Sequence, residues 1–251
     1  MAEQEIIKHT KKAFAILKSS DTNIRKKLAD ILIEILIIVF AVTISIWLSN
    51  WSERRHDRKE EKEFFIGFKK DLQSEIVRMT NSKEFYFKTL HGIMYFIDAA
   101  NGSALNKDSI NKYSGIFFSS TDLYPHIGRY EGLKSSGKFR IIENKELLNL
   151  IIDLQETIIQ RIQTLNDKYY KHNEKLESLI EQNIKLGKSG ELLNPEAVLN
   201  RSDMKILLST SSGIITGNIL SIHDEGIAKC KEIIALIDQE LKQEGSQREM
   251  K

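Results

Sequence analysis

The sequence predicts an all-α protein: one N-terminal transmembrane helix followed by an elongated antiparallel helical bundle. Three observations indicate this fold. An uninterrupted apolar segment lies near the N-terminus, apolar residues elsewhere recur at steps of three and four, and only two prolines occur in 251 residues. Proline interrupts a helix interior, so long helices can form here without a break. No segment alternates with a period of two, and no sheet is expected.

The segment from Leu28 to Trp51 is predicted to be a transmembrane helix retained as a signal anchor. At ~1.5 Å per residue it spans roughly 36 Å, enough to cross a hydrocarbon core of ~30 Å with some tilt. Trp47 and Trp51 form an aromatic belt at one end, and Arg54 and Arg55 follow them. These four residues are expected at the membrane interface. A cleaved signal peptide is disfavoured because LSNWSERR follows, where a small-residue cleavage site is needed.

The anchor divides the chain into four expected parts: a short N-terminal tail (1–27), the anchor (28–51), a helical bundle domain (52–243) and a disordered C-terminal tail (244–251). Lys and Arg are similarly frequent on both sides of the anchor, so the positive-inside rule alone does not set the orientation. A short tail before a first anchor most simply stays in the cytoplasm. The bundle is then expected on the far side of the membrane.

One acidic residue, Glu34, lies inside the predicted span, where an unpaired carboxylate is costly. On a wheel of ~100° per residue, Ala41, Ser45 and Ser49 lie within about 60° of it. Small residues let helices approach closely, and polar groups can hydrogen-bond across the contact. This stripe predicts a helix-association seam, most simply in a homo-oligomer. The alternative is that Glu34 only reaches back to a basic residue or a lipid amine at the interface.

Helices expected after the anchor cover residues 65–97, 108–118, 145–186 and 202–243. The first carries a stripe of coiled-coil or bundle type, and ANGSALN ends it with glycine and asparagine chemistry. Asn144 is the expected N-cap of the third helix. Asn194 followed by Pro195 is a standard helix start. Gly213 and Gly217 are expected to bend or interrupt the last helix.

The segment GLKSSGKF, from Gly132 to Phe139, nearly matches the phosphate-binding pattern G-x-x-x-x-G-K-[ST]. Phe139 occupies the position where a hydroxyl would hold magnesium, and the residues before the segment are not an apolar strand. We therefore expect no nucleotide to bind. We interpret the segment as a tight helix–turn–helix corner in which Gly132 and Gly137 let the backbone reverse.

The composition gives no indication of other chemistry. The formal net charge is +2, without the clustered basic excess typical of nucleic-acid-binding proteins. The single cysteine, Cys230, excludes a disulfide framework and a Cys-rich metal site. No two histidines have metal-ligand spacing, and nothing marks a base beside any serine. We assign no catalytic, metal or cofactor residue, and we expect neither an enzyme nor a nucleic-acid partner.

Two stretches carry a resemblance. IEILIIVFAVTISIWLSNWSERR keeps Glu34, Asn50 and Trp51 at the separation of the anchor pattern G-E-I-x-L-V-x-x-G-I…I-N-N-W-N-E, with Ala41 and Ser49 replacing a glycine and an asparagine. YEGLKSSGKFRIIENKELLNLI is similar to Y-x-x-L-x-S-S-G-x-x-x-x-I-x-N-x-x-L. Together they resemble a bacterial domain-of-unknown-function family of small single-pass membrane proteins. The resemblance implies a membrane-anchored helical protein, in the bacterial inner membrane, with no known activity.

These observations predict a non-enzymatic membrane-anchored bundle that works by association. Its expected role is that of a scaffold, partner-binding or sensory module, with the lipid bilayer and an unknown protein as partners. The alternative is a small oligomeric pore or transport accessory subunit built around Glu34.

Overall fold

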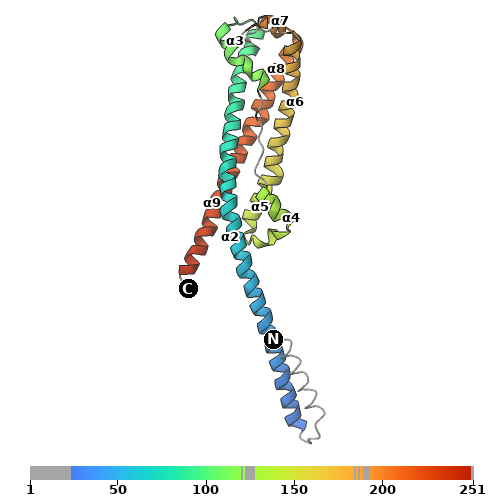
Figure 1. Cartoon of the computed structure of the whole chain (residues 1–251), viewed down its shortest axis with the longest axis vertical. Helices are drawn as coiled ribbons and strands as arrows, with labels where there is room; N and C mark the ends of the chain where they lie inside the picture. The colour runs from blue at the N-terminus through green and yellow to red at the C-terminus, as the bar shows by residue number, and fades with distance from the viewer. Residues whose placement is uncertain are drawn as a thin grey trace. The chain divides into compact units, whose positions relative to one another are not determined.

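The structure is a computed structural model of the 251-residue chain. It describes residues 24–119, 121, 128–183, 185, 187–188 and 193–249, and the side chains of these between residues 28 and 243 (Figure 1). Most of the predicted tail at 1–27 lies outside the described residues. The chain divides into two compact units, Met1–Lys62 and Glu63–Lys251. The division falls later than the predicted boundary after Trp51, because the buried core of the second unit begins at Phe64.

Every regular element among the described residues is helical, which confirms the predicted all-α class. In chain order the elements are α2 (Ile24–Ala100), α3 (Lys107–Tyr113), η1 (Ser114–Phe118), α4 (Gly128–Ser135), η2 (Lys138–Ile141), α5 (Lys145–Asp153), η3 (Leu154–Ile158), α6 (Ile159–Asn183), α7 (Pro195–Leu199), α8 (Ser202–Ile214), η4 (Ile215–Ile219) and α9 (Leu220–Glu249). Of the η elements, η1 and η2 are 3₁₀ helices, and η3 and η4 are single π turns.

The predicted end of the first long helix is confirmed. α2 stops at Ala100, and Gly102 follows with a φ of 104°, a conformation that a side chain disfavours. The amide of Ser103 returns to the carbonyl of Asp98 at 3.0 Å and satisfies one of the last free carbonyls of the helix. The Asn106 side chain then accepts hydrogen bonds from two amides of the first turn of α3.

The two later long helices each contain a π turn that the sequence pattern does not predict. α5, η3 and α6 form one helical run, and α8, η4 and α9 form another. A π turn inserts one extra residue, so adjacent residues become buried together. Ile158 and Ile159 are both buried, as are Ile214 and Ile215. The second π turn contains Gly217, one of the two glycines at which an interruption was expected.

The predicted caps are partly confirmed. The Asn144 side chain accepts a hydrogen bond from the amide of Leu147, as expected of an N-cap. Asn194 precedes Pro195, the first residue of α7, but its side chain does not cap that helix. It accepts from the amide of Lys185 at 2.8 Å and donates to the carbonyl of Asn183 at 3.3 Å. Asn194 therefore closes the end of α6, where the last carbonyls lack helical partners.

The predicted C-terminal tail needs a correction. The last helix was expected to end near residue 243, with disorder from 244 to 251. α9 instead continues to Glu249, and residues 250 and 251 lie outside the described part of the chain. Glycine at position 245 is tolerated in a helix at a cost of about 1 kcal/mol, so it does not by itself end one.

Within the second unit, α8–α9 runs antiparallel to α2 and to α6 (Figure 1). Lys69 pairs with Asp238 and Lys83 with Asp224, so residue numbers fall along α9 as they rise along α2. α2 and α6, in contrast, run parallel, because Met79 and Ile162 meet at one level beside Gly226, while Tyr86 bonds Asn166 further along both helices. The predicted antiparallel arrangement therefore holds for only two of the three helix pairs.

The parallel pair arises because the chain returns along α2 before the second long run begins. The ring of Phe117 packs on that of Phe96, near the end of α2, whereas Arg129 bonds Asp71, near the start of the bundle. A parallel neighbour requires such a return connection, which a short turn cannot provide.

The core of the bundle consists of two apolar clusters. The first joins residues 64–79 of α2 to α4, α5, η3, the start of α6 and residues 222–237 of α9. The second joins residues 86–100 of α2 to η1, the later part of α6, α7 and α8. Near the level where the two clusters meet, the three long helices carry the polar residues Ser82, Asn166 and His223.

Candidate functional site

The N-terminal part of α2 is long and apolar enough to cross a membrane, judged by length and composition. Only 6% of its most apolar window is buried. Large side chains such as Leu36 and Phe40 are 62% and 67% exposed. The helical stretch Ser202–Gln243 passes the same test, but 39% of its window is buried, and its apolar residues belong to the bundle core. The two apolar stretches therefore differ in burial: the first is almost entirely exposed, and the second contributes to the bundle core.

The four residues of the predicted seam lie on the same helix with different exposure. Glu34 is only 3% exposed, and Ala41 is half-buried. Ser45 and Ser49 are exposed, and the Ser45 hydroxyl donates to the carbonyl of Ala41 at 2.8 Å. Glu34 also has an interaction of its own within the chain. Glu34 and Ala41 are thus at least partly buried, whereas Ser45 and Ser49 are exposed. The homo-oligomer stays a prediction.

The four predicted interface residues lie where the apolar window ends. Trp47 and Trp51 are exposed. The guanidinium of Arg55 lies 4.8 Å from the ring centroid of Trp51, and the Arg54 side chain donates to the carbonyl of Asn50 at 3.3 Å. Aromatic rings beside cations at the end of an apolar helix match the arrangement expected at a membrane–water interface.

The segment Gly132–Phe139, which nearly matches the phosphate-binding pattern, is a corner between α4 and η2. Gly137 has a φ of 67°, in the left-handed region, which confirms it as a turn residue. Gly132 does not take that role: it lies inside α4, has no positive φ, and a Cβ added there would meet nothing within 4 Å. The reversal depends on Gly137 because one left-handed residue is enough to end α4.

Polar contacts fix this corner to the rest of the bundle. The Tyr130 hydroxyl donates to Glu156 in the π turn η3 at 2.7 Å, and Lys134 bonds the same carboxylate. The hydrogen bond from Lys134, and then that from Tyr130, lowers the pKa of Glu156. Arg129 of α4 donates to Asp71 of α2 at 2.8 Å. Its guanidinium also covers Gly67 of α2 so closely that a Cβ added there would overlap it.

A buried polar layer crosses the bundle between the two apolar clusters. His223 is fully buried; its Nδ1 bonds the carbonyl of Ile219 at 2.8 Å, and its Nε2 lies 3.1 Å from the hydroxyl of Ser82. A carbonyl only accepts, so Nδ1 carries the proton and Nε2 accepts from the serine. Burial lowers the pKa of His223. Beside it, Tyr86 donates to Asn166 at 2.9 Å.

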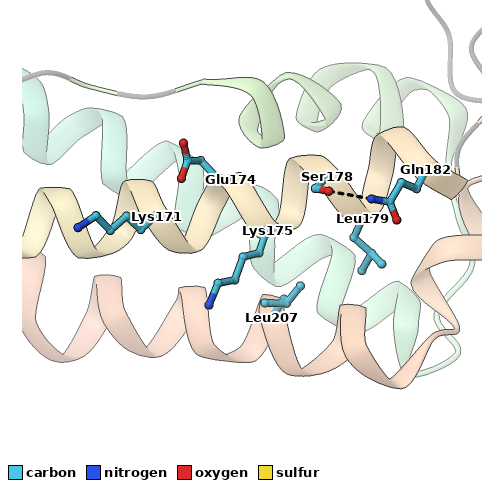
Figure 2. Close-up of a pocket in the computed structure, with 7 residues that line it drawn as sticks. All are labelled: Lys171, Glu174, Lys175, Ser178, Leu179, Gln182 and Leu207. Atoms are coloured by element: carbon cyan, nitrogen blue, oxygen red, sulfur yellow. Dashed lines mark hydrogen bonds between the residues drawn. The ribbon is translucent and has the colours of Figure 1, made fainter.

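The open surface of the bundle has a groove between α6 and α8. Two hollows of about 530 and about 380 Å³ share Lys171 and Lys175. Together their lining runs from Thr164 to Gln182 along α6. In Figure 2, Lys175 extends from α6 toward α8 beside Leu207, whereas Glu174 points to the opposite side of α6. The sequence does not predict this groove, since nothing in it shows that α8 lies against this face of α6.

The groove lysines lack carboxylate partners. Lys168, Lys171 and Lys175 form no hydrogen bond or ion pair with any described residue. Cations at other positions on the bundle do pair, for example Lys69 with Asp238 and Lys229 with Asp153. The spacing of three and four residues, which brings the three lysines onto one helix face, is the signal that sequence reasoning could have used.

Among the described residues, no group of three or more His, Cys, Asp or Glu side chains is arranged to hold a metal ion. Comparisons with family models, with curated proteins and with solved structures find no match.

Proposed function

We propose that this protein is a single-pass membrane-anchored helical bundle that works by association with a protein partner, as a scaffold, partner-binding or sensory module. In this proposal the N-terminus is cytoplasmic, and the bundle lies on the far side of a bacterial inner membrane. The function is binding and not catalysis.

The observation that carries the proposal is the exposed apolar part of α2. Soluble monomers rarely expose a contiguous apolar patch larger than a few hundred Å². A helix with Leu32, Leu36 and Phe40 all more than half exposed is therefore expected to be covered by lipid. The interfacial contact between Trp51 and Arg55 supports the same reading.

One feature of the bundle supports association. The surface between α6 and α8 carries a groove with three lysines on its α6 side. Grooves between helices are a common binding surface for helical segments of other proteins.

The proposal is tested by crosslinking the tagged full-length chain in native membranes and isolating it in detergent. We expect one protein to be recovered in a fixed ratio to the chain. A Leu36→Lys/Phe40→Lys variant, which should lose the membrane, is the control and should lose that protein. Ion flux through vesicles reconstituted with the chain, abolished by Glu34→Gln, would contradict the proposal and favour the pore.

A further inference from the structure

We propose that the groove between α6 and α8 binds an acidic amphipathic segment of the protein partner. The partner's carboxylates meet Lys168, Lys171 and Lys175, and its apolar side chains cover the groove floor. This inference rests on the proposed association function and names the chemistry of the partner.

The first argument is shape. From Thr164 to Gln182 the groove lining extends roughly 27 Å along α6, at ~1.5 Å per residue. The three ammonium groups come from residues spread over about two helical turns and do not converge on one point. A free phosphate or a nucleotide needs convergent donors, so an extended ligand fits this groove better.

The second argument is charge. Three lysines at spacings of three and four repel one another on a helix face, and no described carboxylate neutralises them. Two acids, Asp167 and Glu174, also line the groove, but in Figure 2 Glu174 points away from the α8 side. The three lysines outnumber the two acids of the lining, so its net charge is positive, and a negatively charged partner reduces the repulsion among the lysines.

The third argument is the floor of the groove. Leu179 and Leu207 are half-buried, and Ile214 is buried. An apolar floor beside a row of lysines on α6 matches a segment with leucine-like and acidic residues on one face. It does not match a polyphosphate chain, which has no apolar groups to cover the floor.

The test measures fluorescence anisotropy of a labelled helical peptide with leucine and glutamate at steps of three and four, titrated with the full-length chain in lipid nanodiscs. We expect saturable binding that weakens with added salt. Replacing the glutamates of the peptide by glutamine should weaken binding at least tenfold. Lys171→Glu/Lys175→Glu should weaken it at least tenfold, and Lys171→Arg/Lys175→Arg should retain it.

Lys231→Glu is the matched control, because Lys231 is exposed on α9 away from the groove lining and should not affect binding. Thermal unfolding of each variant checks that it is folded. The inference is overturned if the peptide does not bind, if the glutamine peptide binds equally well, or if the charge-reversed chain binds as the wild type does. If the chain floats with membranes but fails these binding tests, the groove proposal is wrong and the membrane-anchor proposal still stands.

Discussion

The hydroxyl of Tyr130, in helix α4, donates a 2.7 Å hydrogen bond to Glu156, in the π turn η3. This bond joins the glycine corner to a place where the long α5–α6 run departs from regular helix geometry. π turns appear mostly as single turns within α-helices, frequently at functional sites. Within this turn, Glu156 accepts hydrogen bonds from both Tyr130 and Lys134.

Tyr130→Phe should therefore destabilise the bundle by about 1 kcal/mol, the typical contribution of one hydrogen bond. For a domain of this size that corresponds to a fall of roughly 2 to 4 °C in Tm. Circular dichroism of the full-length chain in detergent measures the change. An unchanged Tm would show that the bond does not stabilise the corner.

The two corner glycines should respond in opposite ways to alanine. Gly137→Ala puts a side chain at a φ of 67° and should cost about 1 kcal/mol. Gly132→Ala lies in helix α4 with open space around the new methyl group, so it should be neutral or stabilise by up to ~1 kcal/mol. Thermal unfolding of both variants tests the pair. Equal destabilisation would contradict the assignment of Gly137 as the only turn residue of the two.

The stability of the bundle should depend on pH through His223. Its pKa is lowered from the ordinary value of 6.5 by burial, against opposing effects of the Ile219 carbonyl and Asp224 and a smaller lowering by Lys83. The unfolded chain therefore binds the proton more readily than the folded one. The stabilisation is complete above about pH 6.5 and is lost as the pH falls from there toward the folded pKa.

Denaturant unfolding at pH 7.5, 6.5 and 5.5 measures this dependence. The free energy of unfolding should decrease over that range in the wild type. His223→Gln, which cannot be protonated, should show a shallower decrease. Parallel curves for the two proteins would mean that other groups cause the pH dependence.

The predicted seam gives a test in the apolar part of α2. Ala41→Leu should weaken any oligomer, because a bulky side chain prevents close helix contact. Ile44→Leu is the control, since residue 44 lies about 80° from Glu34 on the wheel. Crosslinking in membranes compares the oligomers of the two variants with the wild type. The same oligomers in all three would exclude the seam.

The sequence was sufficient where one local signal decides the structure. The glycine after Ala100, the Asn144 cap and the left-handed Gly137 depend on neighbouring residues alone. It was insufficient where distant segments decide. Neither the parallel direction of α2 and α6 nor the groove beneath Lys171 can be derived from periodicity, because a stripe of apolar residues does not specify which helix covers it.

Sequence alone also could not distinguish Gly132 from Gly137 or reveal the two π turns. Gly132 belongs to the same motif as Gly137, and only the backbone conformation distinguishes a helical glycine from a turn glycine. The π turns escape notice because a single extra residue changes the apolar stripe too little to detect in one sequence.

The central claim is that the apolar part of α2 anchors the chain in a membrane. Flotation of native membranes after alkaline carbonate washing tests it most directly, because the wash releases peripheral proteins and retains those that span the bilayer. The full-length chain should float with the lipid, and Leu36→Lys/Phe40→Lys should shift it toward the soluble fraction, since each central lysine costs about 2.5 to 3.5 kcal/mol on insertion. Wild-type chain recovered in the soluble fraction after the wash would contradict the membrane anchor and the function proposed from it.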